Sequence, residues 1–227
     1  MVRKLERLRP LAGHLAPIKK RQLLIIAGAN GSGKSTAYTD TRIIEDIRAL
    51  WIINPDLLTR HIQEIEGKAL PEANLAAVRR MMTWLRASIR CHVSIGLETV
   101  LSTDKYRPLV RMAKRRGFEV KLIYVVLNSP ALNIARVKRR VKAGGHDVPE
   151  QKIISRRAKS LAQLPWFLAK ADYALIIDNS QEAGTPVTIV QKKPTADGFV
   201  VEFDPLLNKE IGGIMQNTDW DALIRSR

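Results

Sequence analysis

The segment from Gly28 to Ser35, which reads GANGSGKS, constrains this chain more than any other feature of the sequence. It matches the pattern G-x-x-x-x-G-K-[ST], in which glycines let backbone N–H groups turn inward around phosphate oxygens. An apolar run at residues 23–27 precedes the loop, and the residues after it predict a helix from about Gly33 to Asp46. Because strand, loop and helix follow in the order that such a loop requires, the segment predicts a site for nucleotide phosphates.

The same pattern gives roles to individual positions. Lys34 is expected to reach the β- and γ-phosphates of ATP, and the Ser35 hydroxyl is expected to coordinate Mg²⁺. ATP and Mg²⁺ are therefore the predicted cofactors. The loop residues expected to contact ATP are Gly28, Ala29, Asn30, Gly31, Ser32, Gly33, Lys34, Ser35 and Thr36.

Short apolar runs alternate with amphipathic stretches up to about residue 184. Uniformly apolar strands that alternate with helices predict a mainly parallel sheet covered on both faces. The expected fold is a P-loop NTPase/kinase-like, three-layer α/β/α architecture with a helical lid and a C-terminal β-hairpin. The expected strands are 23–27, 51–53, 93–100, 119–127 and 173–177, and the later helices are 56–66, 71–90, 105–116, 131–143 and 149–164. In the helix at 71–90, the core-facing residues are expected to be Leu75, Val78, Met82, Leu85 and Ile89.

We expect three parts along the chain. Residues 1–22 form a basic N-terminal arm, and residues 23–184 form a P-loop kinase domain with its lid at about 140–158. Residues 185–227 contain a hairpin and a tail that pack on the same domain. The hairpin is expected from residues 186–191 and 198–203, which flank a polar turn, and a short helix is expected near Trp220.

Composition limits the class of protein without choosing a function. The net charge of +16, from 38 basic and 22 acidic residues, attracts polyanions such as nucleic acid, anionic membranes, nucleotides or acidic proteins. No apolar run approaches 18 residues, so no membrane-spanning helix is expected. The single cysteine, Cys91, can form no internal disulfide, and we interpret it as a packing residue of a cytoplasmic protein.

Several classes of P-loop protein do not fit the sequence. The chain contains no LSGGQ-like signature of an ABC-type ATPase and no N-K-x-D motif of a GTPase. At 227 residues it is also too short for a typical AAA+ module with its helical lid domain. The features that remain are those of a kinase.

Two acidic residues follow expected strands. Asp56 comes just after the strand at 51–53, where a kinase needs a carboxylate to orient an acceptor hydroxyl and take its proton. Glu98 and Thr99 end the next strand and are expected to bind the substrate, with Glu98 able to hold Mg²⁺-bound water. The alternatives are that Asp56 only caps a helix, and that Glu98-Thr99 is an ordinary polar pair at the end of a strand.

Arginines gather where kinases of this fold carry a mobile lid. Arg136 and Arg140 share one helix face, Gly144-Gly145 permits a reversal, and Arg156-Arg157 lies on the next helix. Closing arginines stabilise the charge that spreads over the transferred phosphoryl group. We therefore assign Arg136 to ATP binding, and Arg140, Arg156 and Arg157 to catalysis together with Lys34 and Asp56. A solvated basic face is the alternative.

Taken together, these motifs resemble the zeta-toxin family of P-loop kinases. The matching pieces are residues 27–36, Ile53-Asn-Pro-Asp56, Glu98 to Ser102, Arg140 to Pro149 with Arg156-Arg157, and Asp178-Asn179-Ser180. The resemblance implies that Asp56 is the general base, that Lys34 and the lid arginines hold the γ-phosphate, and that Glu98 and Thr99 face an acceptor sugar. We place Asp178-Asn179-Ser180 near the adenine side. The resemblance also suggests an antitoxin protein as a partner, although no motif in the chain requires one.

The sequence therefore predicts an ATP- and Mg²⁺-dependent phosphotransferase acting on a hydroxyl of a small acceptor, such as UDP-N-acetylglucosamine. One alternative is a polynucleotide 5′-hydroxyl kinase, which the basic helix at 105–116 would suit. Nucleic acid is less favoured, because only Tyr106 and Phe118 lie near that helix as stacking aromatics. A second alternative is a non-catalytic binding module gated by ATP.

Overall fold

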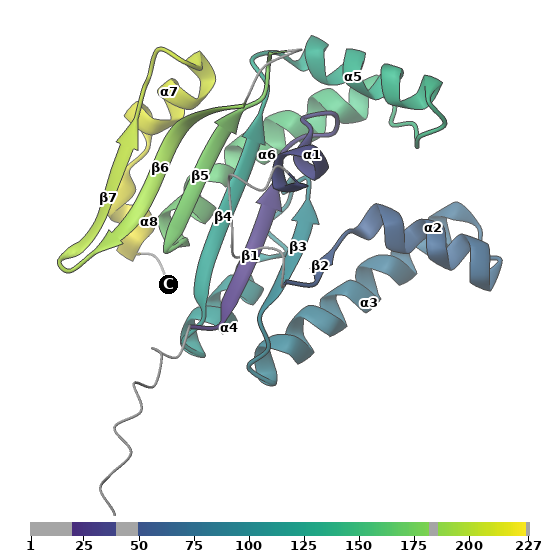
Figure 1. Ribbon diagram of the computed structural model, residues 1–227, viewed down its shortest axis with the longest axis horizontal. Helices are drawn as coiled ribbons and strands as arrows, with labels where there is room; N and C mark the ends of the chain where they lie inside the picture. Colours follow the sequence, from purple (N-terminus) through teal and green to yellow (C-terminus); the bar gives the residue numbers. More distant parts are fainter. Residues whose placement is uncertain (1–19, 40–49, 182–185, 226–227) are drawn as a thin grey trace, which may run out of the picture.

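The computed structural model describes residues 20–39, 50–181 and 186–225. A seven-stranded sheet forms its centre, with the strand order β2-β3-β1-β4-β5-β6-β7 (Figure 1). The strands are β1 (Gln22–Ala27), β2 (Ile52–Ile53), β3 (Ile95–Thr99), β4 (Glu119–Val126), β5 (Tyr173–Asp178), β6 (Val187–Thr195) and β7 (Gly198–Phe203). The helices are α1 (Lys34–Thr39), α2 (Pro55–Glu66), α3 (Leu70–Arg90), α4 (Arg107–Arg115), α5 (Pro130–Lys142), α6 (Glu150–Lys170), α7 (Lys209–Asn217) and α8 (Trp220–Arg225).

The five strands from β1 to β5 are parallel, whereas β6 and β7 are antiparallel and extend the same sheet beyond β5. This arrangement confirms the predicted kinase-like α/β fold and the C-terminal hairpin. The carboxyl ends of β1, β2, β3 and β4 meet at one edge of the sheet, where ligands bind in such folds. The predicted continuation of the helix after the phosphate loop, residues 40–46, and most of the basic arm, residues 1–19, lie outside the described residues.

The main core lies between one face of the sheet and helices α3, α4 and α6. Its apolar side chains come from alternate positions of the strands, among them Leu23 and Ile25 of β1, and from buried residues of these helices such as Leu85 and Leu164. A smaller cluster covers the opposite face, and it is formed by Leu24 and other strand residues whose side chains point to that face. Side chains on both faces of the central strands are thus buried, as a parallel sheet requires.

The core-facing side of α3 differs from the prediction. Its buried residues are Ala73, Ala77, Met81, Leu85 and Ile89, whereas Leu75 is 53% exposed. Helix α2 packs against α3 through Ile62, and the two small alanines let the helices approach closely. Because the prediction favoured the larger apolar residues, it chose Leu75, which lies about half a helical turn from the buried side, and Val78, which lies about a quarter turn from it.

The ends of α6 and β6 also differ from the expected ranges. Helix α6 continues through Pro165 to Lys170, because burial of Trp166, Phe167 and Leu168 offsets the hydrogen bond that proline cannot make. Strand β6 continues to Thr195, so the polar turn of the hairpin is shorter than predicted. Pro194 is tolerated there because β5 pairs with β6 only as far as Lys192.

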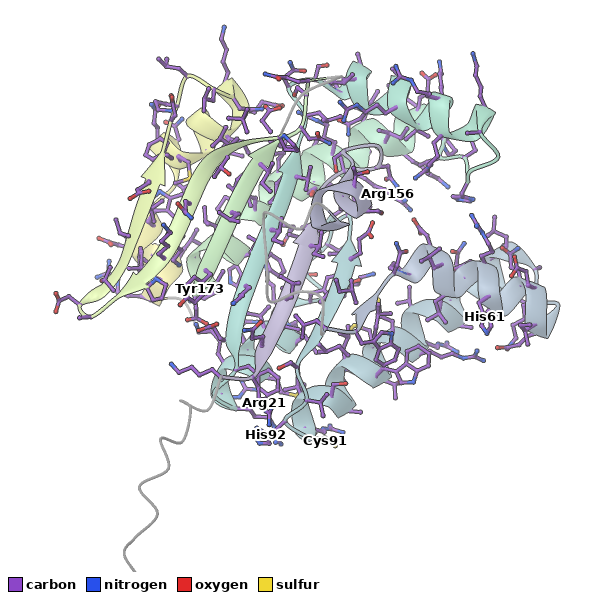
Figure 2. All side chains as sticks on the ribbon, viewed as in Figure 1. Arg21, His61, Cys91, His92, Arg156 and Tyr173 are labelled. Carbon is purple, nitrogen blue, oxygen red and sulfur yellow. The ribbon has the colours of Figure 1, made fainter. Side chains whose placement is uncertain are left out.

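Cys91 and His92 lie at the end of the molecule opposite the phosphate loop, close to the start of β1 (Figure 2). Cys91 is exposed, so the interpretation of this cysteine as a packing residue is wrong. Within the three described stretches, none of the helices combines the length and apolar character needed to cross a membrane.

A buried lysine in the hairpin predicts a pH-dependent stability. Lys192 is 4% exposed, and its ammonium donates to the carbonyls of Leu168 and Ala169 at 3.0 Å each, at the end of α6. Burial, with repulsion from Lys114 as the next cause, lowers the pKa of Lys192 to about 8. Between about pH 8 and the ordinary lysine pKa of about 10.4, Lys192 is protonated in the unfolded chain but has lost its proton in the folded one. The free energy of unfolding contributed by Lys192 therefore increases as pH rises through this range.

The expected result is that the free energy of unfolding of the wild type, minus that of Lys192→Met, increases between about pH 8 and about pH 10. Denaturant unfolding of both proteins at several pH values measures this difference. A difference that stays constant across the window would contradict the lowered pKa.

Candidate active site

The phosphate loop follows β1, and its glycines allow the backbone to turn tightly. Gly28 and Gly31 have φ angles of 145° and 76°, which side chains rarely allow. A Cβ atom would lie 2.3 Å from Val125 O at Gly28 and 2.4 Å from Asn133 O at Gly31. The backbone of β4 and α5 therefore packs directly on the loop and leaves no space for a side chain.

Two amide side chains hold the loop from outside. Asn133 of α5 is fully buried, and its Nδ2 donates to Asn30 O at 2.8 Å. Asn179, just after β5, donates from Nδ2 to Ser32 O at 3.0 Å. The segment from Asp178 to Ser180 thus lies beside the phosphate loop, and its amide fixes a loop carbonyl.

Lys34 is 9% exposed and donates from Nζ to Ala29 O at 3.1 Å. Burial lowers the pKa of its ammonium, the negative charges of Glu98 and Asp56 oppose that effect, and the positive charge of Arg140 adds to it. The three residues that influence Lys34 are thus three of those that the sequence assigned to the site. The fold brings them together from β3, α2 and α5.

Ser35, Asn54 and Glu98 form a small hydrogen-bonded group at the edge of the sheet. Glu98 is 8% exposed and accepts from Ser35 Oγ at 3.2 Å and from Asn54 Nδ2 at 3.0 Å. A hydroxyl beside a carboxylate supplies the oxygen ligands that Mg²⁺ prefers, and Mg²⁺ normally takes few ligands from the protein and the rest from phosphates and water. The donor set therefore fits the predicted metal.

Asn54, and not Asp56, caps α2. The Asn54 Oδ1 accepts hydrogen bonds from Asp56 N at 2.9 Å and from Leu57 N at 3.3 Å. The carboxylate of Asp56 is exposed and lines the adjoining cavity. This geometry excludes the alternative that Asp56 serves only as a helix cap.

A cavity of about 390 Å³ opens between α2 and the loop that joins α5 to α6. Glu98 lines it from β3, Ser35 from the start of α1, and Asp56 from α2. Arg140 lines it from α5, and its Nη2 donates to His146 O at 2.8 Å, which fixes this loop to α5. The remaining residues that line the cavity are Asn54, Leu57, Thr59, Arg60, Gln63, Leu70, Asn74, Gly144, Gly145 and His146.

Arg136 lies close to Gly33 of the phosphate loop. Its Nη1 is 3.9 Å from the position that a Cβ atom of Gly33 would take, and its Nη2 donates to Gln181 O at 3.2 Å. The structure therefore places Arg136 beside the phosphate loop, next to the segment from Asp178 to Ser180, and not in the cavity.

Thr99 and Arg156 are not brought into the cavity. Thr99 is buried, and its Oγ1 accepts a hydrogen bond from Leu101 N at 3.0 Å. Successive residues of a strand point to opposite faces, so Thr99 turns inward where Glu98 faces the cavity. Arg156, labelled in Figure 2, is exposed on α6 and is not among the residues that line the cavity.

Arg157 also lies elsewhere than predicted. Its side chain is 5% exposed, and its guanidinium donates to both carboxylate oxygens of Glu210 and to Leu127 O. The distance from Nη1 to Glu210 Oε1 is 2.7 Å, and that from Nη2 to Leu127 O is also 2.7 Å. With these bonds made, Arg157 anchors α6 to α7 and to the end of β4, and it does not point toward the phosphate site.

Sequence reasoning missed several polar residues of the cavity. Arg60 and Gln63 follow Asp56 by four and seven residues, so helical periodicity alone puts all three on one face of α2. Asn74 comes from the neighbouring α3 and accepts from Thr59 Oγ1 at 3.1 Å. Only the packing of α2 against α3 brings Asn74 to the cavity, and no signal in the sequence indicates it.

The sequence pattern that defines the family described as Zeta toxin matches residues 12–182. The chain belongs to the zeta-toxin family. The resemblance drawn from the sequence is thereby confirmed. Among curated proteins, this zeta-toxin family member is 29% identical over 133 residues to an uncharacterized protein of Haemophilus influenzae, with 59% of this chain and 90% of that protein covered.

Solved structures share the fold of this zeta-toxin family member. A complex of AvrRxo1-ORF1 with AvrRxo1-ORF2, also solved with ATP, matches with a TM-score of 0.64 at 18% identity, over 84% of this chain and 63% of that chain. The PezAT toxin–antitoxin system of Streptococcus pneumoniae gives a TM-score of 0.53 at 18% identity, over 70% of this chain and 69% of that chain. The Pnkp1/Rnl/Hen1 RNA repair complex gives 0.51 at 18% identity, over 64% of this chain and 45% of that chain.

Replacing Gly31 by alanine is expected to abolish detectable binding of Mg·ATP, because the new Cβ would clash with the backbone of Asn133. The control is Gly213→Ala in α7, where nothing lies within 4 Å of the added atom and alanine suits the helix. Calorimetric titration of both proteins with Mg·ATP measures the effect. Equal affinity of the two variants would contradict the packing described for the loop.

Proposed function

We propose that this protein is an ATP- and Mg²⁺-dependent phosphotransferase that moves the γ-phosphoryl group of ATP to a hydroxyl of a small acceptor. The observation that carries the proposal is the cavity in which Asp56, Glu98, Ser35 and Arg140 converge next to the buried Lys34. A phosphate loop, a carboxylate open to an acceptor and an arginine from the lid are the parts that such a transfer requires.

The ATP half of the site rests on the loop. Its inward N–H groups would bind the phosphates, and the Lys34 ammonium would move from Ala29 O to the β- and γ-phosphate oxygens. The negative charge of the phosphates would oppose the effect of burial, which lowers the pKa of Lys34, and would therefore favour the protonated ammonium. Arg136, beside Gly33, would contact the nucleotide from the other side of the loop.

Ser35 and Glu98 would hold Mg²⁺, Ser35 through its hydroxyl and Glu98 through the carboxylate or a bound water. When bound, the ion neutralises part of the charge on the phosphates. Asn54 keeps Glu98 directed toward Ser35 while capping α2, so it sets the distance between the metal ligands and Asp56.

The acceptor half rests on Asp56. Its carboxylate would accept the proton of the acceptor hydroxyl as the hydroxyl oxygen bonds to the γ-phosphorus. The bond between that phosphorus and the oxygen bridging to the β-phosphate breaks, and ADP leaves. Arg140, whose guanidinium is held by His146 O and whose charge reaches Lys34, would stabilise the charge on the transferred group.

The lining of the cavity favours a polar, anionic acceptor. Arg60 adds a positive charge on the same face of α2 as Asp56, and Gln63 and Asn74 supply amides for hydroxyl or carbonyl groups. The volume of about 390 Å³ suits a small molecule. A nucleotide sugar such as UDP-N-acetylglucosamine combines these features. A partner that acts as an antitoxin is part of the same proposal, since the PezAT structure is that of a toxin–antitoxin system.

The alternative of a polynucleotide kinase has the fold of the RNA repair complex in its favour. Its proposed basic track on α4 is weakened by contacts within the protein. The guanidinium of Arg107 lies 5.0 Å from the ring centroid of Trp166 and donates to Gln163, and Lys114 pairs with Asp172 at 2.7 Å. These side chains are held against the protein instead of extending toward a backbone.

A transfer assay tests the proposal. The wild type is incubated with Mg²⁺ and γ-labelled ATP in the presence of UDP-N-acetylglucosamine, other nucleotide sugars, NAD or a 5′-hydroxyl oligonucleotide. Label on one small acceptor supports the proposal and names the substrate, whereas label on the oligonucleotide supports the polynucleotide kinase. Tight ATP binding with no transfer to any of these acceptors would favour the ATP-gated binding module.

A further inference from the structure

The first turn of α7 is joined to β5, although α7 lies outside the residues matched by the family. Its N-cap residue, Asn208, is 4% exposed, and its Oδ1 accepts from Ile211 N at 3.2 Å. The Nδ2 of the same side chain donates to Asp178 Oδ2 at 2.7 Å. Asn208 therefore starts α7 and fixes it to the carboxyl end of β5.

The link continues from Asp178 to the phosphate loop. Asp178 Oδ1 accepts from Ser180 N at 2.8 Å, which closes a tight turn around Asn179. Asn179 N donates to Val126 O at 3.0 Å, and its Nδ2 donates to Ser32 O at 3.0 Å. A displacement of Asp178 would consequently move the amide that holds Ser32.

A second link joins α7 to the lid helix. Glu210, in the first turn of α7, accepts two hydrogen bonds from the buried guanidinium of Arg157 on α6. Loss of this carboxylate would leave a buried positive charge without its counter-charge. Three residues further along α6, Ser160 Oγ donates to Val100 O at 2.6 Å. The middle of α6 is thus fixed to both α7 and the sheet.

We infer that Asn208 and Glu210 are positioning residues for phosphoryl transfer, acting through Asn179 on the phosphate loop and through Arg157 on the base of the lid. The inference rests on the proposed function and deepens it, because it adds a C-terminal helix to the same phosphate site. Neither side chain touches the substrates. Asn208 acts by holding Asp178 and the turn at Asn179, and Glu210 acts by holding Arg157 on α6.

The variant Asn208→Asp tests the first link. Aspartate is also a strong helix N-cap, so α7 keeps its cap, but two carboxylates now face each other where an amide met a carboxylate. The expected result is Mg·ATP binding weaker by about 5- to 20-fold, the lower part of the range of coupling between linked sites, with an unchanged KM for the acceptor. Glu210→Gln is expected to lower kcat more than ATP affinity, because it loosens the lid helix and not the loop.

Exchanging the two side chains provides the rescue. Asp178→Asn combined with Asn208→Asp restores an amide–carboxylate pair with donor and acceptor reversed, and the new asparagine can still accept from Ser180 N. ATP affinity is expected to return to within about twofold of the wild type, as coupled residues do in double-mutant cycles. Lys209→Ala, an exposed change in the same turn, is the control and should leave the affinity unchanged.

Calorimetric titration with Mg·ATP, well below the melting temperature of every variant, measures these affinities. Should Asn208→Asp fail to fold, Asn208→Ser keeps a cap and removes the reach to Asp178. A lower melting temperature with unchanged ATP affinity and kcat would overturn the inference, as would a double variant that restores nothing. Absence of transfer by the wild type would overturn the proposed function, and ATP affinity alone would then decide the inference.

Discussion

Replacing Asp56 by asparagine should lower phosphoryl transfer by about 100- to 10,000-fold, the usual contribution of a general base. The amide keeps the size of the side chain but cannot accept the hydroxyl proton. Asn54 caps α2 and is unaffected, so the helix and the cavity should keep their shape. The affinity for Mg·ATP should remain within about twofold of the wild type, because the hydrogen bond of Lys34 goes to Ala29 O and not to Asp56.

Glu64→Gln is the matched control, since Glu64 is an exposed acid on the same helix that does not line the cavity. Transfer rates at saturating acceptor and Mg·ATP affinities, measured on one preparation of each protein, separate chemistry from binding. Transfer by Asp56→Asn at the wild-type rate would remove Asp56 as the base.

Replacing Lys34 by alanine should lower transfer by about 100- to 1000-fold with every acceptor, the usual loss when one charge-stabilising donor is removed. The loss is independent of the acceptor because Lys34 would act on the phosphates of ATP and not on the second substrate. Lys34 is buried and surrounded by Glu98, Asp56 and Arg140. Its removal takes a positive charge away while the negative charges of Glu98 and Asp56 remain, so ATP binding should weaken as well.

The control for this variant is Lys159→Ala, which removes an exposed lysine from α6, away from the residues that line the cavity. It also holds net charge equal between the two variants, so a general loss of attraction for ATP cannot explain a difference. Initial rates with two chemically different acceptors provide the measurement. If Lys34→Ala lost activity with one acceptor only, Lys34 would be reading the acceptor, contrary to the proposal.

The parts of the site that lie close together in sequence were predictable. The phosphate loop is one continuous motif, and Asp56 and Glu98 follow strands whose carboxyl ends meet at one edge. Strand alternation could also have separated Glu98 from Thr99, because adjacent residues of a strand face opposite sides.

Contacts between distant segments could not be predicted in the same way. Arg157 looked like a lid arginine because its partner, Glu210, follows 53 residues later in a segment that no motif covered. No motif in the sequence marks Asn133 or Asn179 as a site residue. Their amides reach the phosphate loop only because α5 and β5 pack beside it. The face of α3 depended on α2, whose close packing selected two alanines over larger apolar residues.

The hairpin has a consequence for where this protein can be divided. Strand β6 pairs with β5 along residues 187–192, and Ile189 and Val190 belong to the main core. A protein cut after residue 182, at the end of the family match, would expose the whole edge of β5 and uncover apolar surface beneath β6. Such a fragment would be prone to aggregate through strand pairing. The unit of homology is therefore smaller than the unit of folding.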